Sequence, residues 1–306
     1  MIVAAATYAM PRAGRGSGEP LRPCDVQTEA ARSDEYFGEP GASSLRREGQ
    51  ATYTRPGTDI HLRGRAWAPK GRPVTEAQVV FAVGPCTRTA RVFGPRRWAQ
   101  GAGGPRPGMP EPFTSVELRY ELCVGGAIEA RNPVGVGVHR SAREAIGMPL
   151  PQIEDDEQLL REWSERPPPA GLGPVARAWQ PRLGYAGTYD LAWLESRAPL
   201  WPCDLDPRFF HAAAPGLWVT PHLRGGEPVL LRGCHPDGDV RFELPRRSLV
   251  ARTYHRRDGV REQTMRLDAV DVDGESGTVQ LVWRTAALLR GGVFEHEATV
   301  VAEVAG

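Results

Sequence analysis

TDIHLRGRAW (residues 58–67) and QVVFAVGPCTRTARVFG (residues 78–94) are the stretches that decide the fold. In the first, Ile60 and Leu62 alternate with polar residues, and strict alternation is typical of a half-buried β-strand. In the second, QVVFAV and TARVFG flank the short linker GPCT, which predicts a β-hairpin. The fold is therefore expected to be built from antiparallel strands.

Further strands are expected on both sides of these stretches. The segments are VELRYEL (116–122), LWVTPHL (217–223), EPVLLRG (227–233), VRFELP (240–245), LVARTYH (249–255), REQTMRLDAV (261–270), TVQLVWRT (278–285) and EATVVAEV (297–304). The Asp-Gly pairs in HPDGD (235–239) and DVDGESG (271–277) predict turns. Strands do not alternate with long helices, which argues against a doubly wound sheet. We expect a mainly β protein with antiparallel sheets in a sandwich-like or strongly curved arrangement, two or three short helices and long ordered loops.

The two or three short helices are expected at the following positions. EDDEQLLREWSER (154–166) has acidic residues at its start and apolar residues at helical spacing. Asp190 is placed to cap a helix over 191–197, and Pro207 suits a first helical position.

The domain organisation follows from where the strand pattern begins. Residues 1–50 are rich in Gly, Pro and Ser, which predicts a partly ordered N-terminal extension. Residues 51–306 are expected to form a β-rich domain as two lobes, 51–146 and 170–306, joined by a helical, proline-rich connector.

Aromatic residues gather in a region dense in Pro and Gly. Four of the eight tryptophans lie between positions 179 and 218, and a disordered linker would be poor in aromatics. These rings either fix the loops against the sheet or form a recognition surface. The second alternative is considered because Trp, Tyr and Arg dominate interface hot spots. A carbohydrate-binding surface is a third interpretation. Trp283, within an apolar strand, is expected in the core. The candidate partner-binding residues are Trp179, Tyr185, Trp193, Trp201 and Trp218.

Composition excludes several classes of protein. The 306 residues carry 38 basic and 37 acidic side chains, a net charge of +1, which argues against nucleic-acid or membrane-surface binding. No apolar run is long enough to span a bilayer. The five cysteines are odd in number and lack CxxC spacing, so neither a disulfide framework nor a zinc ribbon is expected. We predict a cytoplasmic protein.

No catalytic, cofactor or metal motif stands out. The seven histidines fall in no metal-ligand pattern, GxSxG is absent, and the Gly-rich segments lack the P-loop lysine. Asp204 and Asp206 are more suited to capping or turns than to catalysis. The enzymatic alternative is a carbohydrate-active or other hydrolase that uses Asp204 and Asp206, or one of them with Glu195, in a cleft lined by Trp193 and Trp201. We expect no enzyme activity, no cofactor and no metal.

An ordered set of segments resembles a known bacterial family. The segments include PGTDIHLRGRAWAPKGRPV (56–74), VGPCTRTARVFGPRRW (83–98), VELRYELCVGGAIEARNPVGVG (116–137), the aromatic stretch PPPAGLGPVARAWQPRLGYAGTYDLAWLESRAPLWPCDLDPRFFHAAAPG (167–216) and LRGGEPVLLRGCHPDGDVRFELP (223–245). From about residue 50 onward, the chain resembles a domain of unknown function found in type VI secretion gene clusters.

That resemblance implies a cytoplasmic, non-enzymatic adaptor or chaperone. Its expected partner is a secreted effector or toxin, or a PAAR-like spike-tip protein, and the VgrG spike is a further candidate. Irregular loops on a β scaffold, or a sheet edge that pairs with an extended segment, would suit such binding. The resemblance supplies no catalytic residues.

Overall fold

The structure is a computed structural model that describes residues 1–14, 21–50, 53–257, 259–287 and 293–304. Strands dominate, as predicted, and the two α-helices of these ranges are short: α1 (Ala142–Ala145) and α2 (Leu191–Ser196). Five 3-10 turns complete the helical elements: η1 (Pro69–Gly71), η2 (Tyr120–Leu122), η3 (Arg182–Tyr185), η4 (Pro207–Phe210) and η5 (Val293–Glu295). No helix in the described ranges has the length and apolar character needed to cross a bilayer.

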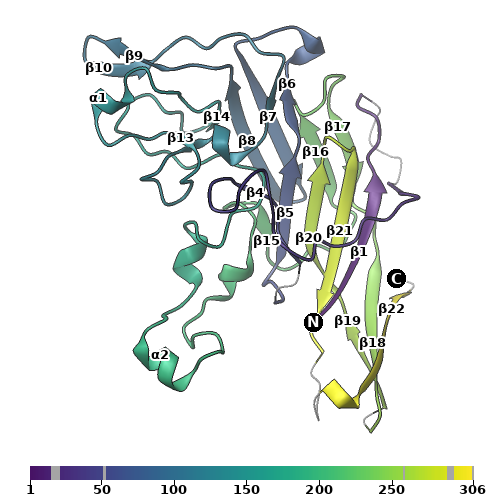
Figure 1. Cartoon of the computed structure of the whole chain (residues 1–306). Coiled ribbons are helices and arrows are strands. Elements are labelled where there is room, and N and C mark those ends of the chain that lie inside the picture. The colour runs from purple at the N-terminus through teal and green to yellow at the C-terminus, as the bar shows by residue number, and fades with distance from the viewer. Residues whose placement is uncertain (15–20, 51–52, 258, 288–292, 305–306) are drawn as a thin grey trace.

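The largest sheet has six strands, and Figure 1 shows its long strands running side by side through the middle of the molecule. In spatial order they are β15 (Trp218–Val219), β5 (Thr58–Arg63), β20 (Arg266–Asp273), β21 (Thr278–Thr285), β1 (Ile2–Ala9) and β2 (Arg22–Pro23). All neighbours are antiparallel except β5 and β20, which are parallel and therefore depart from the purely antiparallel expectation. The DVDGESG turn joins β20 to β21, as predicted.

The N-terminal segment is part of this sheet. Strand β1 pairs with β21 over its full length, from Ile2 opposite Thr285 to Ala9 opposite Thr278. The predicted N-terminal extension is therefore ordered over these residues, where it belongs to the sheet. Its sequence, IVAAATYA, is mostly apolar without alternation, because small alanine side chains fill positions on both faces of the strand.

A second sheet has five strands: β14 (Ile153–Asp155), β8 (Cys86–Phe93), β7 (Glu76–Val83), β16 (Pro228–Arg232) and β17 (Val240–Glu243). Strands β7 and β8 form the hairpin that the sequence predicted, with Val83 opposite Cys86. Strands β16 and β17 form a second predicted hairpin across the HPDGD turn.

The remaining strands form small sheets. A three-stranded sheet has the order β19 (Gly259–Thr264), β18 (Ser248–His255) and β22 (His296–Val304). The two-stranded pairs are β3 (Glu35–Tyr36) with β4 (Leu45–Arg47), β6 (Arg65–Trp67) with β11 (Ser115–Glu117), β9 (Trp98–Gly101) with β10 (Gly104–Pro107), and β12 (Val124–Gly125) with β13 (Val136–Gly137). The strand predicted over 116–122 is largely wrong, because β11 ends at Glu117 and η2 follows.

The two large sheets share one core. A single cluster of buried apolar side chains includes Ile60 and Val270 from the six-stranded sheet and Phe81 and Phe242 from the five-stranded sheet. Trp283 belongs to it and is 3% exposed, as expected for a core residue. Because this core takes residues from both 51–146 and 170–306, the two stretches share one hydrophobic interior.

The connector is not helical, so the helix predicted over 154–166 is wrong. Glu154 lies in β14 with its side chain buried, and its carboxylate pairs with Arg96 and accepts a hydrogen bond from the backbone N–H of Leu160 at 2.7 Å. Leu160 and Trp163 pack against Trp98 in a small separate cluster. These tertiary contacts outweigh the helix propensity of a segment too short to be stable alone.

The outer face of the six-stranded sheet is polar but not solvated. Asp59 and His61 are 0% and 2% exposed, although they alternate with Ile60 and Leu62 as a solvent-facing set would. The alternation predicted the strand correctly. It did not predict that both faces of this strand are covered.

Candidate functional site

Residues 176–211 form a long segment that extends away from the sheets and returns to them. We call this segment the arm. Its ends meet where the backbone N–H of Val175 donates to the carbonyl of Ala212 at 2.7 Å. The arm contains η3, α2 and η4, and Figure 1 shows α2 projecting away from both large sheets. A small apolar cluster of its own contains Ala186, Phe209 and Phe210.

Aspartate caps shape the arm. Asp190 accepts a hydrogen bond from the backbone N–H of Trp193 at 2.8 Å at the start of α2. Asp206 accepts one from the N–H of Arg208 at 2.9 Å, and Pro207 is the first residue of η4. Each cap satisfies a backbone donor that the first turn leaves free. The helical starts predicted at Asp190 and Pro207 are confirmed, although η4 is a 3-10 turn.

The carboxylates of the hydrolase alternative are engaged in local contacts. Asp204 accepts hydrogen bonds from the backbone N–H and hydroxyl of Thr188 at 3.0 and 2.7 Å, and these bonds lower the pKa of Asp204. The guanidinium of Arg208 pairs with Asp206 at 2.6 Å and lowers the pKa of Asp206. A glycosidase needs one carboxyl with a raised pKa to act as the acid, and neither aspartate has one.

The end of the arm carries apolar side chains without a cover. Leu191, Leu194 and Leu200 are 74%, 60% and 60% exposed, and α2 has no buried residue. Trp193 is half-buried because its indole N–H donates to the carbonyl of Leu200 at 2.9 Å and Tyr189 packs edge-on against it. We call these five residues the apolar tip. Contiguous exposed apolar groups of this kind mark interaction sites more often than scattered ones do.

Buried charges fasten the other end of the arm, and we call these six residues the root network. They are the arginines Arg55, Arg182 and Arg284 and the carboxylates Glu48, Asp59 and Asp268. Arg55 pairs with all three carboxylates, with Glu48 at 2.6 Å and Asp59 at 2.9 Å. Arg182 pairs with Glu48, and Arg284 with Asp268 at 2.6 Å. Three positive and three negative charges balance, which offsets the cost of removing them from water.

The root network also holds the backbone of the arm. The Nε–H of Arg55 donates to the carbonyl of Phe210 at 2.9 Å, and that of Arg182 donates to the carbonyl of Phe209 at 2.8 Å. A second donor of Arg182 reaches the carbonyl of Val175 at 2.8 Å. Through the root network, the C-terminal end of the arm is therefore connected to the N-terminal segment and to strands β5, β20 and β21.

Burial and pairing act in opposite directions on the carboxylates of the network. Burial alone would raise the pKa of Asp59, but Arg55 beside it and the hydrogen bond from His211 hold the pKa of Asp59 below its usual range. Likewise, Arg182 and Arg55 hold the pKa of Glu48 below its usual range against the effect of burial. Both carboxylates are therefore charged in the folded protein at neutral pH.

A cavity of about 180 Å³ lies where the arm meets the sheet, and we call it the root cavity. Tyr185 and Trp218 line it together with His211, whose ring stacks on Trp218 at 4.6 Å. Nδ1 of His211 lies 2.5 Å from Oδ1 of Asp59, and Nε2 has no hydrogen-bond partner among the described residues.

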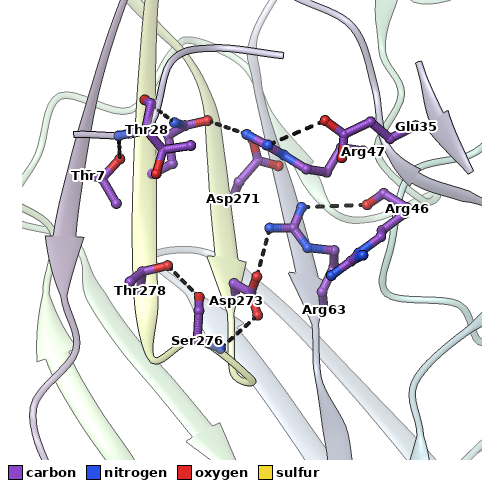
Figure 2. Close-up of a pocket in the computed structure, with 11 residues that line it drawn as sticks. Thr7, Thr28, Glu35, Arg46, Arg47, Arg63, Asp271, Asp273, Ser276 and Thr278 are labelled. Atoms are coloured by element: carbon purple, nitrogen blue, oxygen red, sulfur yellow. Dashed lines mark hydrogen bonds and ion pairs between the residues drawn. The ribbon is translucent and has the colours of Figure 1, made fainter. Parts of the chain in front are cut away.

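Figure 2 shows a second, polar cavity of about 300 Å³ on the outer face of the six-stranded sheet. Its charges are paired within the cavity wall: Arg63 with Asp273 at 3.2 Å and Arg47 with Glu35 at 3.6 Å. Asp271 lies 2.7 Å from Nδ1 of the buried His61. These pairs satisfy most of the charged side chains, but Arg46 also lines the cavity and its guanidinium pairs with no carboxylate within the described ranges.

A third cavity, of about 510 Å³, has an apolar floor that includes Met265 and Trp283 and a rim that includes Arg224 and Arg266. Asp204, Asp206 and Glu195 line none of the three cavities. Within the described ranges, no three His, Cys, Asp or Glu side chains gather so as to hold a metal ion.

The structure separates the five predicted partner-binding residues. Trp179 is a core residue, 6% exposed and edge-on to Tyr120 at 5.4 Å, so its ring pins the start of the arm. Tyr185 and Trp218 line the root cavity, whereas Trp193 belongs to the apolar tip. Trp201 is 37% exposed and packs against Phe209, Phe210 and Tyr53.

Sequence reasoning missed the leucines of the tip and the whole root network. The available signals were the leucines of LAWLESRAPL, which surround Trp193 without a matching polar face, and the charges that alternate with apolar residues in β5. Neither signal says which face is covered.

Fold and site together define a mainly β, sandwich-like protein with a projecting arm that is held by buried charges. The chain belongs to the bacterial family described as "Uncharacterized protein conserved in bacteria (DUF2169)", whose model matches residues 1–284. The match begins at residue 1, so it includes the N-terminal segment that supplies β1. No curated protein and no solved structure matches the chain.

Proposed function

We propose that this protein is a non-enzymatic adaptor or chaperone that binds a type VI secretion effector in the cytoplasm and helps to load it onto the PAAR/VgrG spike. The observation that carries the proposal is the apolar tip, in which three leucines are at least 60% exposed on a helix and loop without a cover. The type VI assignment itself rests on the resemblance of the ordered segments from about residue 50 onward.

The energetics favour a partner at the tip. Complete burial of one leucine side chain contributes about 1.5–3 kcal/mol, so covering three of them offers a substantial driving force. Part of this gain is spent on the freedom that both molecules lose on binding. The root network reduces that cost, because a fastened arm presents its tip in one orientation before the partner arrives.

The same features suit temporary protection of an effector. An apolar surface on the effector would be shielded by the tip until the spike is assembled. The tip is small, so the complex would remain reversible, as a loading factor requires.

The test uses the product of the neighbouring gene, which we expect to be the effector. Leu191→Ser with Leu194→Ser should weaken the complex at least about tenfold, because each lost apolar contact is worth more than the 1.4 kcal/mol that corresponds to tenfold affinity. The variant should retain the wild-type melting temperature, since both side chains are exposed. The readout is isothermal titration calorimetry with the purified effector.

The matched control is Ile146→Ser, which removes a 43% exposed apolar side chain outside the arm. It should leave the affinity unchanged. Equal affinity for the tip variant and the wild type would contradict the proposed role of the tip.

A further inference from the structure

The root cavity contains a buried imidazole with one uncommitted nitrogen. His211 is 5% exposed, and Asp59 occupies its Nδ1. Nε2 is buried and has no partner among the described residues. A buried polar atom without a partner is costly in a folded protein, which makes it a good candidate for a group that a ligand completes.

All ionisable side chains of the cavity lining, apart from the phenol of Tyr185, are basic. They are Arg182, Arg208 and His211, and no carboxylate lies among the ten lining residues. Arg182 uses its donors on Glu48 and on two backbone carbonyls. Arg208 is different, because Nε and Nη2 bind Asp206 while Nη1 makes no hydrogen bond within the described ranges. Nη1 of Arg208 is therefore a donor left for an anion, and Nε2 of His211 is a second polar atom of this lining without a partner among the described residues.

The remaining walls are apolar or aromatic. The ring of Trp218 stacks on His211, and the ring of Tyr185 lies under the Arg208 guanidinium at 4.3 Å. Pro181, Pro215 and Ala213 complete much of the lining. A volume of about 180 Å³ suits a single side chain rather than a large ligand.

We propose that the root cavity binds the side-chain carboxylate of an acidic residue in a segment of the partner protein. The carboxylate accepts a hydrogen bond from Nη1 of Arg208 and lies against the imidazole of His211, while its methylene groups pack against Trp218 and Tyr185. This inference rests on the proposed function. It states which chemical group of the partner, bound at the apolar tip, is also recognised by the root cavity.

The other two cavities lack this combination. In the polar cavity of Figure 2, the carboxylates of Glu35, Asp271 and Asp273 offset the three arginines of the lining, which leaves no excess of positive charge. The third cavity, the largest of the three described above, is basic at its rim, but it has no buried nitrogen without a partner among the atoms of its lining side chains.

The first experiment uses the protein alone. N-acetyl-glutamate methylamide, which carries only the side-chain carboxylate, is titrated while the imidazole signals of His211 and the indole N–H of Trp218 are followed by NMR. N-acetyl-glutamine methylamide is the uncharged control, and glutarate represents a free small acid. We expect saturable shifts with the glutamate compound and at least about tenfold weaker binding of the glutamine compound, because charge-assisted hydrogen bonds are roughly twice as strong as neutral ones.

Two variants make the assignment specific. Arg208→Gln should weaken the glutamate compound about tenfold or more, whereas Arg232→Gln, which removes another half-exposed arginine paired with an aspartate, should not. His211→Gln should have an effect similar to that of Arg208→Gln. If the His211 variant fails to fold, the Arg208 variant alone tests the proposed site. The Arg208 side chain is 51% exposed, so its replacement should leave the fold intact.

The second experiment separates this inference from the proposed function. If the effector complex forms but Arg208→Gln changes neither its affinity nor the glutamate titration, the inference about the cavity is overturned while the adaptor role stands. If the glutamate compound binds but no effector complex forms, the cavity chemistry is supported and the proposed function fails. Binding of glutarate without the glutamate compound, or equal binding of the glutamate and glutamine compounds, would overturn the inference.

Discussion

Trp283 is the residue whose role is simplest to test. Its indole is 3% exposed in the core shared by the two large sheets. Trp283→Ala should lower the free energy of unfolding by about 3–5 kcal/mol, because it removes a large buried side chain and leaves a cavity. Urea denaturation measures the change. Trp193→Ala, on the half-buried indole of the tip, is the control and should cost much less. An unchanged unfolding midpoint for Trp283→Ala would reject its place in the core.

Gly238 tests the HPDGD turn. Its φ of +122° lies in a region that side chains rarely adopt, and a Cβ at this position would meet nothing within 4 Å. Gly238→Val should therefore destabilise the protein by about 1–3 kcal/mol through backbone strain alone. Gly103→Val, at a turn glycine whose φ is not positive and whose Cβ would also have space, should cost less. Similar unfolding midpoints for the two variants would show that backbone conformation at Gly238 is not limiting.

The residue scale also shows what a sequence can reveal. The capping roles of Asp190 and Asp206 were predictable, because a cap acts within three residues along the chain. The burial of Asp59 was not, because its cover comes from Arg55, His211 and residues far apart in sequence. Local chemistry is encoded locally, whereas burial depends on the tertiary fold.

At the scale of elements, the strands were more predictable than the helices. The β7–β8 hairpin was predicted because a period of two and a short turn agree over a compact stretch. The segment 154–166 was predicted wrongly because Leu160 and Trp163, which lie at helical spacing, pack instead as parts of a loop against Trp98. Strand β1 was missed because small alanines give no alternation. The path of the arm was not predicted, although its aromatic and proline content marked it as ordered.

The attachment of the arm depends on the root network, and acid should weaken it. The pKa of Asp59 is lower in the folded protein than its ordinary value of 3.8, so the unfolded chain binds the proton more readily. The stability that Asp59 supplies is therefore present above about pH 4 and is lost as the pH falls below it. Unfolding free energies between pH 7 and pH 2.5 should show this fall, and hydrogen exchange should show that Phe209 and Phe210 lose protection early.

Asp59→Asn supplies the matched comparison. It should destabilise the protein at pH 7 by about 3–5 kcal/mol, because it leaves Arg55 with one partner fewer in a buried site. Its stability should then fall less steeply in acid than that of the wild type. Asp25→Asn, at an exposed position, should behave like the wild type. Identical acid profiles for Asp59→Asn and the wild type would show that Asp59 does not link the arm to pH.

At the scale of the whole molecule, the architecture consists of two packed sheets and an arm that leaves them. Two sheets share one core, the N-terminal segment closes the edge of the larger sheet, and the arm projects from a buried ionic root. Fold class could be predicted because strand periodicity is repeated along most of the chain. The candidate site could be predicted only in part: the aromatic region was identified, but Trp179 turned out to be core, and the exposed leucines depend on the direction in which the arm leaves the sheets.

The central claim is that this molecule holds an effector before secretion. The most direct measurement is the mass, by light scattering coupled to size-exclusion chromatography, of this 33.4 kDa chain co-expressed with the product of the neighbouring gene, which the proposal expects to be the effector. If the protein is an adaptor or chaperone, we expect one complex whose mass equals the sum of both chains in a simple ratio. We also expect the effector to be more soluble than when it is expressed alone. Separate elution of the two proteins, with an effector that is soluble by itself, would contradict the account.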